Sequence, residues 1–271
     1  METVAYNPTY LQKLLGRNYK WWYLVLYSFK QSNIKLLSFA IVNFANVLDF
    51  SITIYLWLLI EPTTERISYF FVGFMLQRLV WSQYSAELAL SITTGKIVNR
   101  LLTPVDNFKF WFFKELGSSI VGKTFSALLI LTFLPVYINY LQLPSVVFIV
   151  LFPLSFIIGY FIDFCFSYIL SGVAFWSEDY RPILLISTVL LKFLTGIAIP
   201  FSYLPSPIGN LLIFNPYSYI NYHPMQIYLG KYSPLETFFV FLGGIAWCLA
   251  FYFLAKWVFK MGLKRNESVG L

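Results

Sequence analysis

The sequence predicts an all-α integral membrane fold with six transmembrane helices, and three observations support that prediction. Of the 271 residues, 59% are hydrophobic and only 11% are charged, whereas about a quarter of the residues in a soluble domain are charged. Long apolar stretches recur along nearly the whole chain and leave no room for a large soluble module. The basic residues gather between alternate stretches. Lipid is therefore expected to surround most of the chain.

Six stretches have roughly the length of about 20 apolar residues that a helix needs to cross a bilayer core. We expect a single transmembrane domain over 1–271, with spans at 35–60, 67–92, 117–137, 146–174, 183–200 and 235–258.

The N-terminal stretch 1–33 is predicted to form an amphipathic helix in the membrane interface. Its apolar residues recur at helical spacing, and its basic residues take the other face. A simple cytosolic helix is the alternative. The apolar set is Leu11, Leu14, Leu15, Trp22, Val25, Leu26 and Phe29.

The positions of the basic residues predict that both termini are cytoplasmic, because cytoplasmic loops of membrane proteins carry an excess of Lys and Arg. With the N-terminus inside, the outer loops keep only Arg66 and Lys231. The net charge of +7 is then explained by topology and anionic lipid, and not by nucleic acid. The cytoplasmic set is Lys13, Arg17, Lys20, Lys30, Lys35, Lys96, Arg100, Lys109, Lys114, Arg181, Lys256, Lys260, Lys264 and Arg265.

Two connections are longer than simple turns. Residues 93–116 form a cytoplasmic loop whose first half is amphipathic, with Ile97, Val98, Leu101 and Leu102 on one face. Residues 201–234 are rich in proline and aromatic residues, which favours short helices or a re-entrant segment on the outer side.

Four charged residues fall inside the predicted spans, where unpaired charges are costly. Counting about 1.5 Å per residue from the cytoplasmic side gives Asp49 and Arg78 similar depths, and likewise Asp163 and Lys192. We expect two ion pairs, Asp49 with Arg78 and Asp163 with Lys192, that are structural or face a wet cavity on a substrate path.

No catalytic or metal site is predicted. His223 is the single histidine, and Cys165 and Cys248 lie in apolar stretches. Residues 117–124 read GSSIVGKT, which fits a phosphate-binding loop, but that loop needs a buried strand before it and a helix packed on a sheet after it. An apolar span follows here, so we interpret the glycines as helix-packing positions and Lys123 as a side chain that reaches the cytoplasmic interface.

Four segments in order resemble the type-two ABC transporter permeases, especially six-helix permeases related to drug, peptide and polysaccharide exporters. The resemblance covers most of the chain, and one departure is Asn215-Pro216-Tyr217, where the family often has Pro-Phe. The segments are TTGKIVNRLLTPVD (93–106), SGVAFW (171–176), GIAIPFSYLP (196–205) and NPYSYINYHPMQIYLG (215–230).

The resemblance implies a multi-pass subunit of the inner (plasma) membrane that dimerises with itself or with a sister permease and binds two ABC ATPase subunits. This chain would carry no cofactor, because ATP and magnesium bind the ATPase. Cargo, of an amphipathic, peptide, lipid-like or glycan kind, would be exported by alternating access along a dimer interface lined by spans one, two and five, with 201–234 as a lid.

The resemblance also assigns residues to the ATPase contact. The 93–106 loop would be the coupling element that enters a cleft of the ATPase, and the turn 177–182 would be a second, smaller contact. These residues are Lys96, Ile97, Arg100, Leu101, Leu102, Pro104, Glu178, Asp179 and Arg181.

Two other classes of protein stay open from the residues alone. An ion-coupled carrier or channel would also use intramembrane charge pairs, although it would give the 93–116 loop no purpose. A membrane-embedded enzyme or assembly factor is the third class, and we find no catalytic residues to nominate for it.

Overall fold

The computed structural model describes residues 19–31, 36–81, 85–144, 146–177 and 179–267, and all regular structure in them is helical. The all-α fold class is therefore confirmed. The longer helices are α2 (Tyr19–Gln31), α3 (Leu36–Ile60), α4 (Thr64–Val80), α7 (Asn107–Leu131), α9 (Val146–Gly172), α10 (Arg181–Leu194) and α13 (Pro234–Glu267). The shorter ones are α5 (Ser85–Thr93), α6 (Ile97–Leu101), α8 (Leu134–Tyr137), η2 (Ile138–Tyr140), η3 (Val173–Phe175), η4 (Phe201–Tyr203), α11 (Ser206–Ile213), η5 (Pro216–Tyr219) and α12 (Tyr222–Tyr228).

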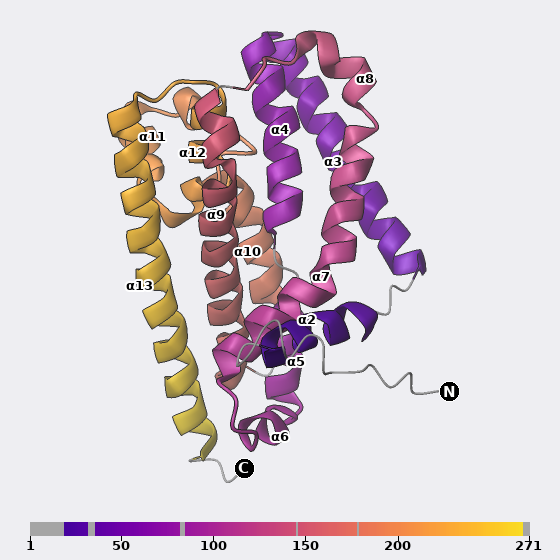
Figure 1. Cartoon of the computed structure of the whole chain (residues 1–271), viewed down its shortest axis with the longest axis vertical. Coiled ribbons are helices and arrows are strands. Elements are labelled where there is room, and N and C mark those ends of the chain that lie inside the picture. Colours follow the sequence, from indigo (N-terminus) through magenta and orange to yellow (C-terminus); the bar gives the residue numbers. More distant parts are fainter. Residues whose placement is uncertain (1–18, 32–35, 82–84, 145, 178, 268–271) are drawn as a thin grey trace.

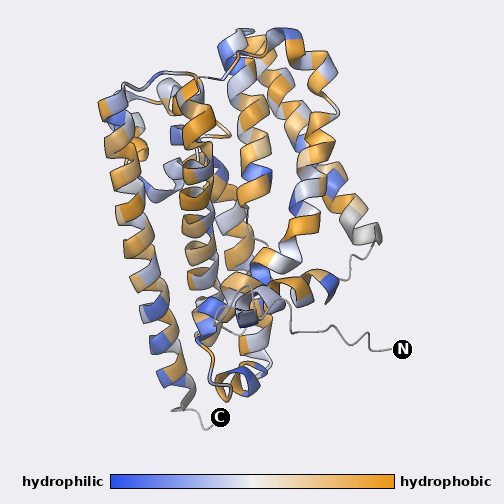
Figure 2. Cartoon of the chain, in the orientation of Figure 1, coloured by the Kyte–Doolittle hydropathy of each residue, from blue (hydrophilic) through white to orange (hydrophobic). Residues whose placement is uncertain are grey.

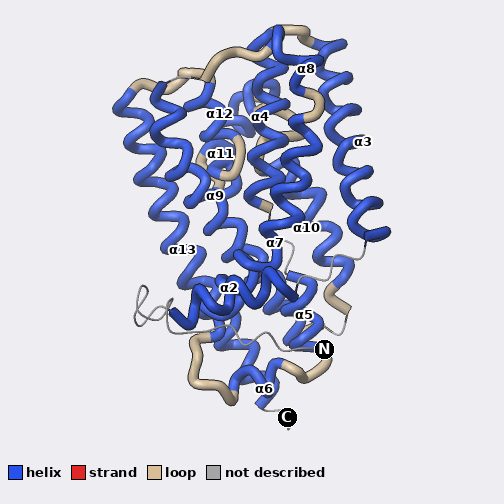
Figure 3. The backbone as a smooth tube through the Cα atoms, turned by 45° about the vertical axis from the view of Figure 1, so that its right-hand side comes forward, coloured by secondary structure: helices blue, strands red, loops and turns tan. Residues whose placement is uncertain are grey.

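Apart from α2, the longer helices run side by side along the molecule (Figure 1). The helix α13 packs on α9, α4 packs on both α3 and α7, and α5 packs on α9. One end of the molecule, hereafter the α6 end, carries α6 and the last turns of α13. The opposite end carries α8, the start of α9 and the upper part of the α11–α12 segment (Figures 1 and 3).

In the part of the chain that the structure describes, three helices are long and apolar enough to cross a membrane, at Ala40–Ile60, Phe148–Phe175 and Pro234–Arg265. A fourth span results if α7 and the α8–η2 segment, which meet at a bend of 41°, count together. Apolar residues dominate these helices, and polar residues gather on the last turns of α13 (Figure 2).

The six-span count is not confirmed, because two predicted spans are short helices. The predicted span 67–92 is divided between α4 and α5, and α4 has 17 residues. The predicted span 183–200 corresponds to α10, which has 14 residues and stops before Gly196, a glycine with φ of 75°. At about 1.5 Å per residue both helices are shorter than the roughly 30 Å hydrocarbon core.

The helix α7 begins ten residues before the predicted span 117–137, inside the predicted 93–116 connection. Asp106 caps it by accepting a hydrogen bond from the Lys109 backbone N–H at 2.9 Å. The first turns are also held by packing, because the buried Phe108 ring meets Phe164 of α9 edge-on. Residues 117–124 lie in the interior of α7, so the GSSIVGKT segment is helical and forms no phosphate-binding loop.

The predicted N-terminal amphipathic helix is described from Tyr19 onward, and residues 1–18 lie outside the described part of the chain. The helix α2 lies across the long helices near the α6 end (Figures 1 and 3). It meets α7 at Gly117, where a Cβ atom would lie 2.1 Å from the Val25 carbonyl oxygen. Trp22, Leu26 and Phe29 remain exposed along one flank of α2, as an interfacial helix requires.

The 201–234 segment folds into short helices that pack on α9 and α4. The Asn215 side chain accepts hydrogen bonds from the backbone N–H groups of Tyr217 and Ser218. His223 is buried below them, with Nε2 3.0 Å from the Ile213 carbonyl and Nδ1 2.9 Å from the Tyr232 hydroxyl. A carbonyl only accepts, so Nε2 carries the proton and Nδ1 accepts from Tyr232. This network fixes α12 against α11.

Candidate functional site

The turn from α5 through α6 to α7 forms the tip of the molecule at the α6 end (Figure 1). Gly95, with φ of 70° and open space around it, reverses the chain after α5. The predicted apolar face of α6 is divided in the structure. Ile97 is buried, whereas Val98, Leu101 and Leu102 are exposed, Leu102 to 79%. Lys96 and Pro104 are exposed beside them, so the tip presents leucines next to a basic residue.

Arg100, which the resemblance assigns to the ATPase contact, packs against α7 in the structure. Its guanidinium carbon lies 3.5 Å from the centre of the Phe110 ring of α7, and its Nη1 donates to the Thr103 hydroxyl at 2.8 Å. Partial burial lowers the pKa of Arg100. The residue thus anchors α6 to α7 through a cation–π contact.

The second predicted contact lies between η3 and α10, and η3 packs on α5 near the α6 end. Arg181 donates from Nε to Asp179 Oδ1 at 2.8 Å, and both side chains are exposed. This hydrogen-bonded pair lowers the pKa of Asp179 and raises that of Arg181. Glu178 lies outside the described residues.

One cluster of charged side chains joins α3, α4 and α10. Asp49 lies 2.7 Å from Lys192 Nζ and 3.8 Å from Arg78 Nη2. Arg78 also donates to the Asn46 side chain at 2.6 Å. The predicted Asp49–Arg78 contact is present, but the predicted partner of Lys192 is wrong: Lys192 pairs with Asp49 and not with Asp163. The prediction paired charges of similar depth on consecutive helices, whereas in the fold Lys192 of α10 meets Asp49 of α3.

Asp163 belongs to a second cluster, which the sequence interpretation missed. It is buried on α9, within electrostatic reach of Lys123. Lys123 was predicted to reach the cytoplasmic interface, but the structure encloses its side chain in the protein. It is buried within α7, 3.3 Å from Glu115 Oε1 and over the Tyr160 ring. Glu115 and Lys123 are eight residues apart and therefore share a helix face. The sequence prediction missed this pairing because it began the helix at residue 117, after Glu115.

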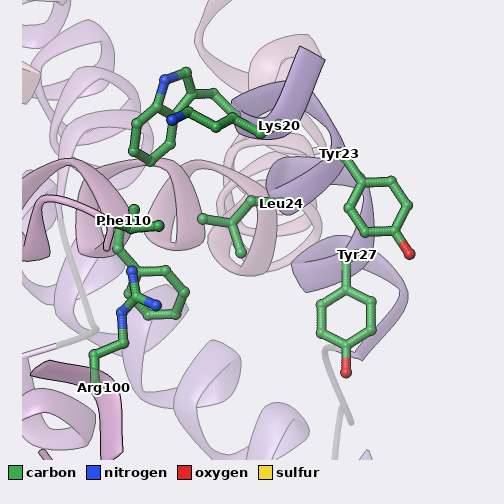
Figure 4. Close-up of a pocket in the computed structure, with 8 residues that line it drawn as sticks. Lys20, Tyr23, Leu24, Tyr27, Arg100 and Phe110 are labelled. Carbon is green, nitrogen blue, oxygen red and sulfur yellow. The ribbon is translucent and has the colours of Figure 1, made fainter. Parts of the chain in front are cut away.

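A cavity of about 190 Å³ separates α2 from the α6 tip and the start of α7. Figure 4 shows Arg100 lying against Phe110 on one side, with Leu24, Tyr23 and Tyr27 on α2 at the other. Its remaining lining residues are Lys20, Trp21 and Val105.

A comparison with protein-family models matches residues 59–270 to the ABC-2 family transporter proteins. This chain belongs to the ABC-2 transporter family. The match covers more than three quarters of the chain and includes both predicted contact turns, Arg78, Asp163 and Lys192, whereas α2, most of α3 and Asp49 precede it. A search of curated proteins and a search of solved structures found no match.

The family membership agrees with the resemblance of the four sequence segments. The ABC-2 protein described here is a type-two ABC permease, an integral membrane protein and a membrane subunit of a transporter. Permeases of this family normally work with an ABC ATPase that is a separate subunit.

Proposed function

We propose that this ABC-2 permease binds its ATPase through the α6 tip and exports an amphipathic, peptide, lipid-like or glycan cargo. The observation that carries the proposal is the construction of the tip. Leu101 and Leu102 are exposed, while Ile97 is buried and Arg100 is stacked on Phe110. An exposed apolar tip on a rigid base transmits a push from a partner to α7. The Asp179–Arg181 turn is the second, smaller contact at the same end.

The transporter in this proposal contains two ATPase subunits and two permeases, either two copies of this chain or one copy and a sister permease. Its α6 end and both termini are cytoplasmic, in the plasma (inner) membrane. The last turns of α13 support this orientation, because Lys256, Lys260, Lys264 and Arg265 all lie there. ATP binding to the ATPase shifts the dimer between inward-open and outward-open states.

The Asp49 cluster supports a cargo path at the dimer interface. It joins α3, α4 and α10, which correspond to the predicted spans one, two and five. Asp49 and Lys192 keep 29% and 36% of their side-chain surface exposed in the single chain. Charges at membrane depth usually face a wet cavity or a protein interior, so a second permease over this face would shelter them. The 201–234 segment is the lid on the outer side of the path.

An ion-coupled carrier is the competing function, and the tip distinguishes the two. We expect Leu102→Asp to reduce co-purification of the ATPase with the tagged permease at least about tenfold, because the substitution places a charge in an apolar contact. The control Leu143→Asp changes a leucine that is 86% exposed near the opposite end. Equal recovery of the ATPase with both variants would contradict the proposed contact, and absence of any ATPase with the unmodified chain would favour the carrier.

A further inference from the structure

The cavity between α2 and the α6 tip has the features of a binding site for an anion. Among the described residues, its lining contains two cationic side chains, Lys20 and Arg100, and no acidic residue. Asp106 lies next to it in the chain, but caps α7 and approaches Lys256 at 3.4 Å. The positive charge of the cavity is therefore not balanced by the side chains that line it.

The guanidinium of Arg100 has hydrogen-bonding capacity that the described protein does not use. Its Nη1 donates to Thr103, but Nε and Nη2 are buried and have no hydrogen-bond partner. Leaving buried charged donors without acceptors lowers stability. A guanidinium is always charged in proteins and is a preferred partner of phosphate and carboxylate groups.

Lys20 is the second cation of the cavity, and it also lacks an acidic partner among the described residues. Its ammonium lies 5.1 Å from the centre of the Trp21 ring. Lys20 comes from α2, whereas Arg100 comes from α6, so an anion held by both side chains would connect the two helices.

The surroundings of the cavity indicate the source of the anion. The helix α2 exposes Trp22, Leu26 and Phe29 on the flank opposite to Lys20 and Tyr27, as expected for a helix whose apolar flank enters the bilayer at the headgroup level. The lining includes the apolar Leu24, Val105 and Phe110. At about 190 Å³ the cavity far exceeds the roughly 10–15 Å³ that admits one water.

We propose that this cavity binds the phosphate of an anionic phospholipid headgroup, with the Arg100 guanidinium and the Lys20 ammonium as its cationic contacts. The apolar lining then contacts the glycerol and the first acyl carbons, which free phosphate lacks. The bound lipid joins α2 to the α6 tip. Binding by the permease alone does not depend on the ATPase contact proposed above.

The test uses the full-length permease in detergent, without any ATPase, and three probes: dioctanoyl phosphatidylglycerol, dioctanoyl phosphatidylcholine and inorganic phosphate. Native mass spectrometry and thermal melts give the affinity for each probe. We expect phosphatidylglycerol to bind more tightly than either other probe. Arg100→Gln should weaken its binding at least about tenfold, because one of the two positive charges at the cavity is lost, and Lys20→Gln should weaken it several-fold.

Lys109→Gln is the matched control, because Lys109 is an exposed basic residue of α7 that does not line the cavity. It should bind phosphatidylglycerol within twofold of the unmodified chain. If Arg100→Gln does not fold, Lys20→Gln provides the same test. Equal affinity in the cavity variants and the control overturns the site. Equal protection by inorganic phosphate, or equal binding of phosphatidylcholine, overturns the assignment to an anionic lipid.

Discussion

Asp49 has two cationic neighbours, which lie at different distances from its carboxylate. Lys192 is closer, at 2.7 Å, whereas Arg78 lies at 3.8 Å and also donates to Asn46. Neutralising Asp49 would leave two positive charges side by side in a low-dielectric region, where like charges repel strongly. The arrangement makes Lys192 more dependent on Asp49 than Arg78 is.

We expect Asp49→Asn to lower the stability of the purified chain by on the order of 2 kcal/mol, between the values typical of surface and buried ion pairs. Adding Lys192→Gln should recover most of the loss, because it removes the ammonium left without a partner. Adding Arg78→Gln should recover less. Thermal unfolding in detergent measures all three variants, and equal rescue by both second substitutions would argue against the observed pairing.

His223 makes the fold sensitive to acid. The histidine lies outside the candidate membrane spans, and burial lowers its pKa from 6.5 to about 4. Between these values the unfolded chain binds a proton that the folded chain excludes. The stability contributed by neutral His223 is thus complete above pH 6.5 and is lost as the pH falls toward 4.

We therefore expect a loss of about 2 kcal/mol in the free energy of unfolding between pH 7.5 and pH 5. His223→Gln should show a much smaller loss, because it removes the single histidine of the chain. Thermal or denaturant unfolding of both proteins at the two pH values provides the measurement. Parallel losses in the two proteins would assign the acid sensitivity to other groups.

At the scale of elements, the sequence predicts where apolar helices lie better than where they begin, end or meet. The long stretches that became α3, α9 and α13 are visible as apolar length, the quantity that decides whether a helix can span a bilayer. The early start of α7 was also visible, since Asp106 is a good N-cap residue just after Pro104. The division of 67–92 into α4 and α5 was not, because the sequence between them contains no proline or glycine, the strongest local signals of a helix end.

The candidate site shows the same division between local and long-range information. The exposed leucines of the α6 tip follow from a local amphipathic pattern. The burial of Ile97, the stacking of Arg100 on Phe110 and the pairing of Lys192 with Asp49 depend on which helices are neighbours. Depth along a span is readable from residue counts, whereas adjacency of α3 and α10 is a property of the whole fold.

At the scale of the whole molecule, the chain has two chemically different ends. The α6 end combines exposed leucines, the helix α2 with its exposed apolar flank and the basic last turns of α13. Toward the opposite end lies the aromatic 201–234 segment, held by buried hydrogen bonds of Asn215 and His223. A permease driven by a separate ATPase needs such an asymmetry, since ATP is available on one side of the membrane.

Site-specific photo-crosslinking tests this account most directly. A benzophenone amino acid replaces Leu102 at the α6 tip in one variant and Leu143, near the opposite end, in another. Both positions are highly exposed, so both probes reach any protein that binds there. We predict a crosslink between the permease and its ATPase from position 102 and none from position 143. A crosslink from position 143 together with none from position 102 would contradict the account.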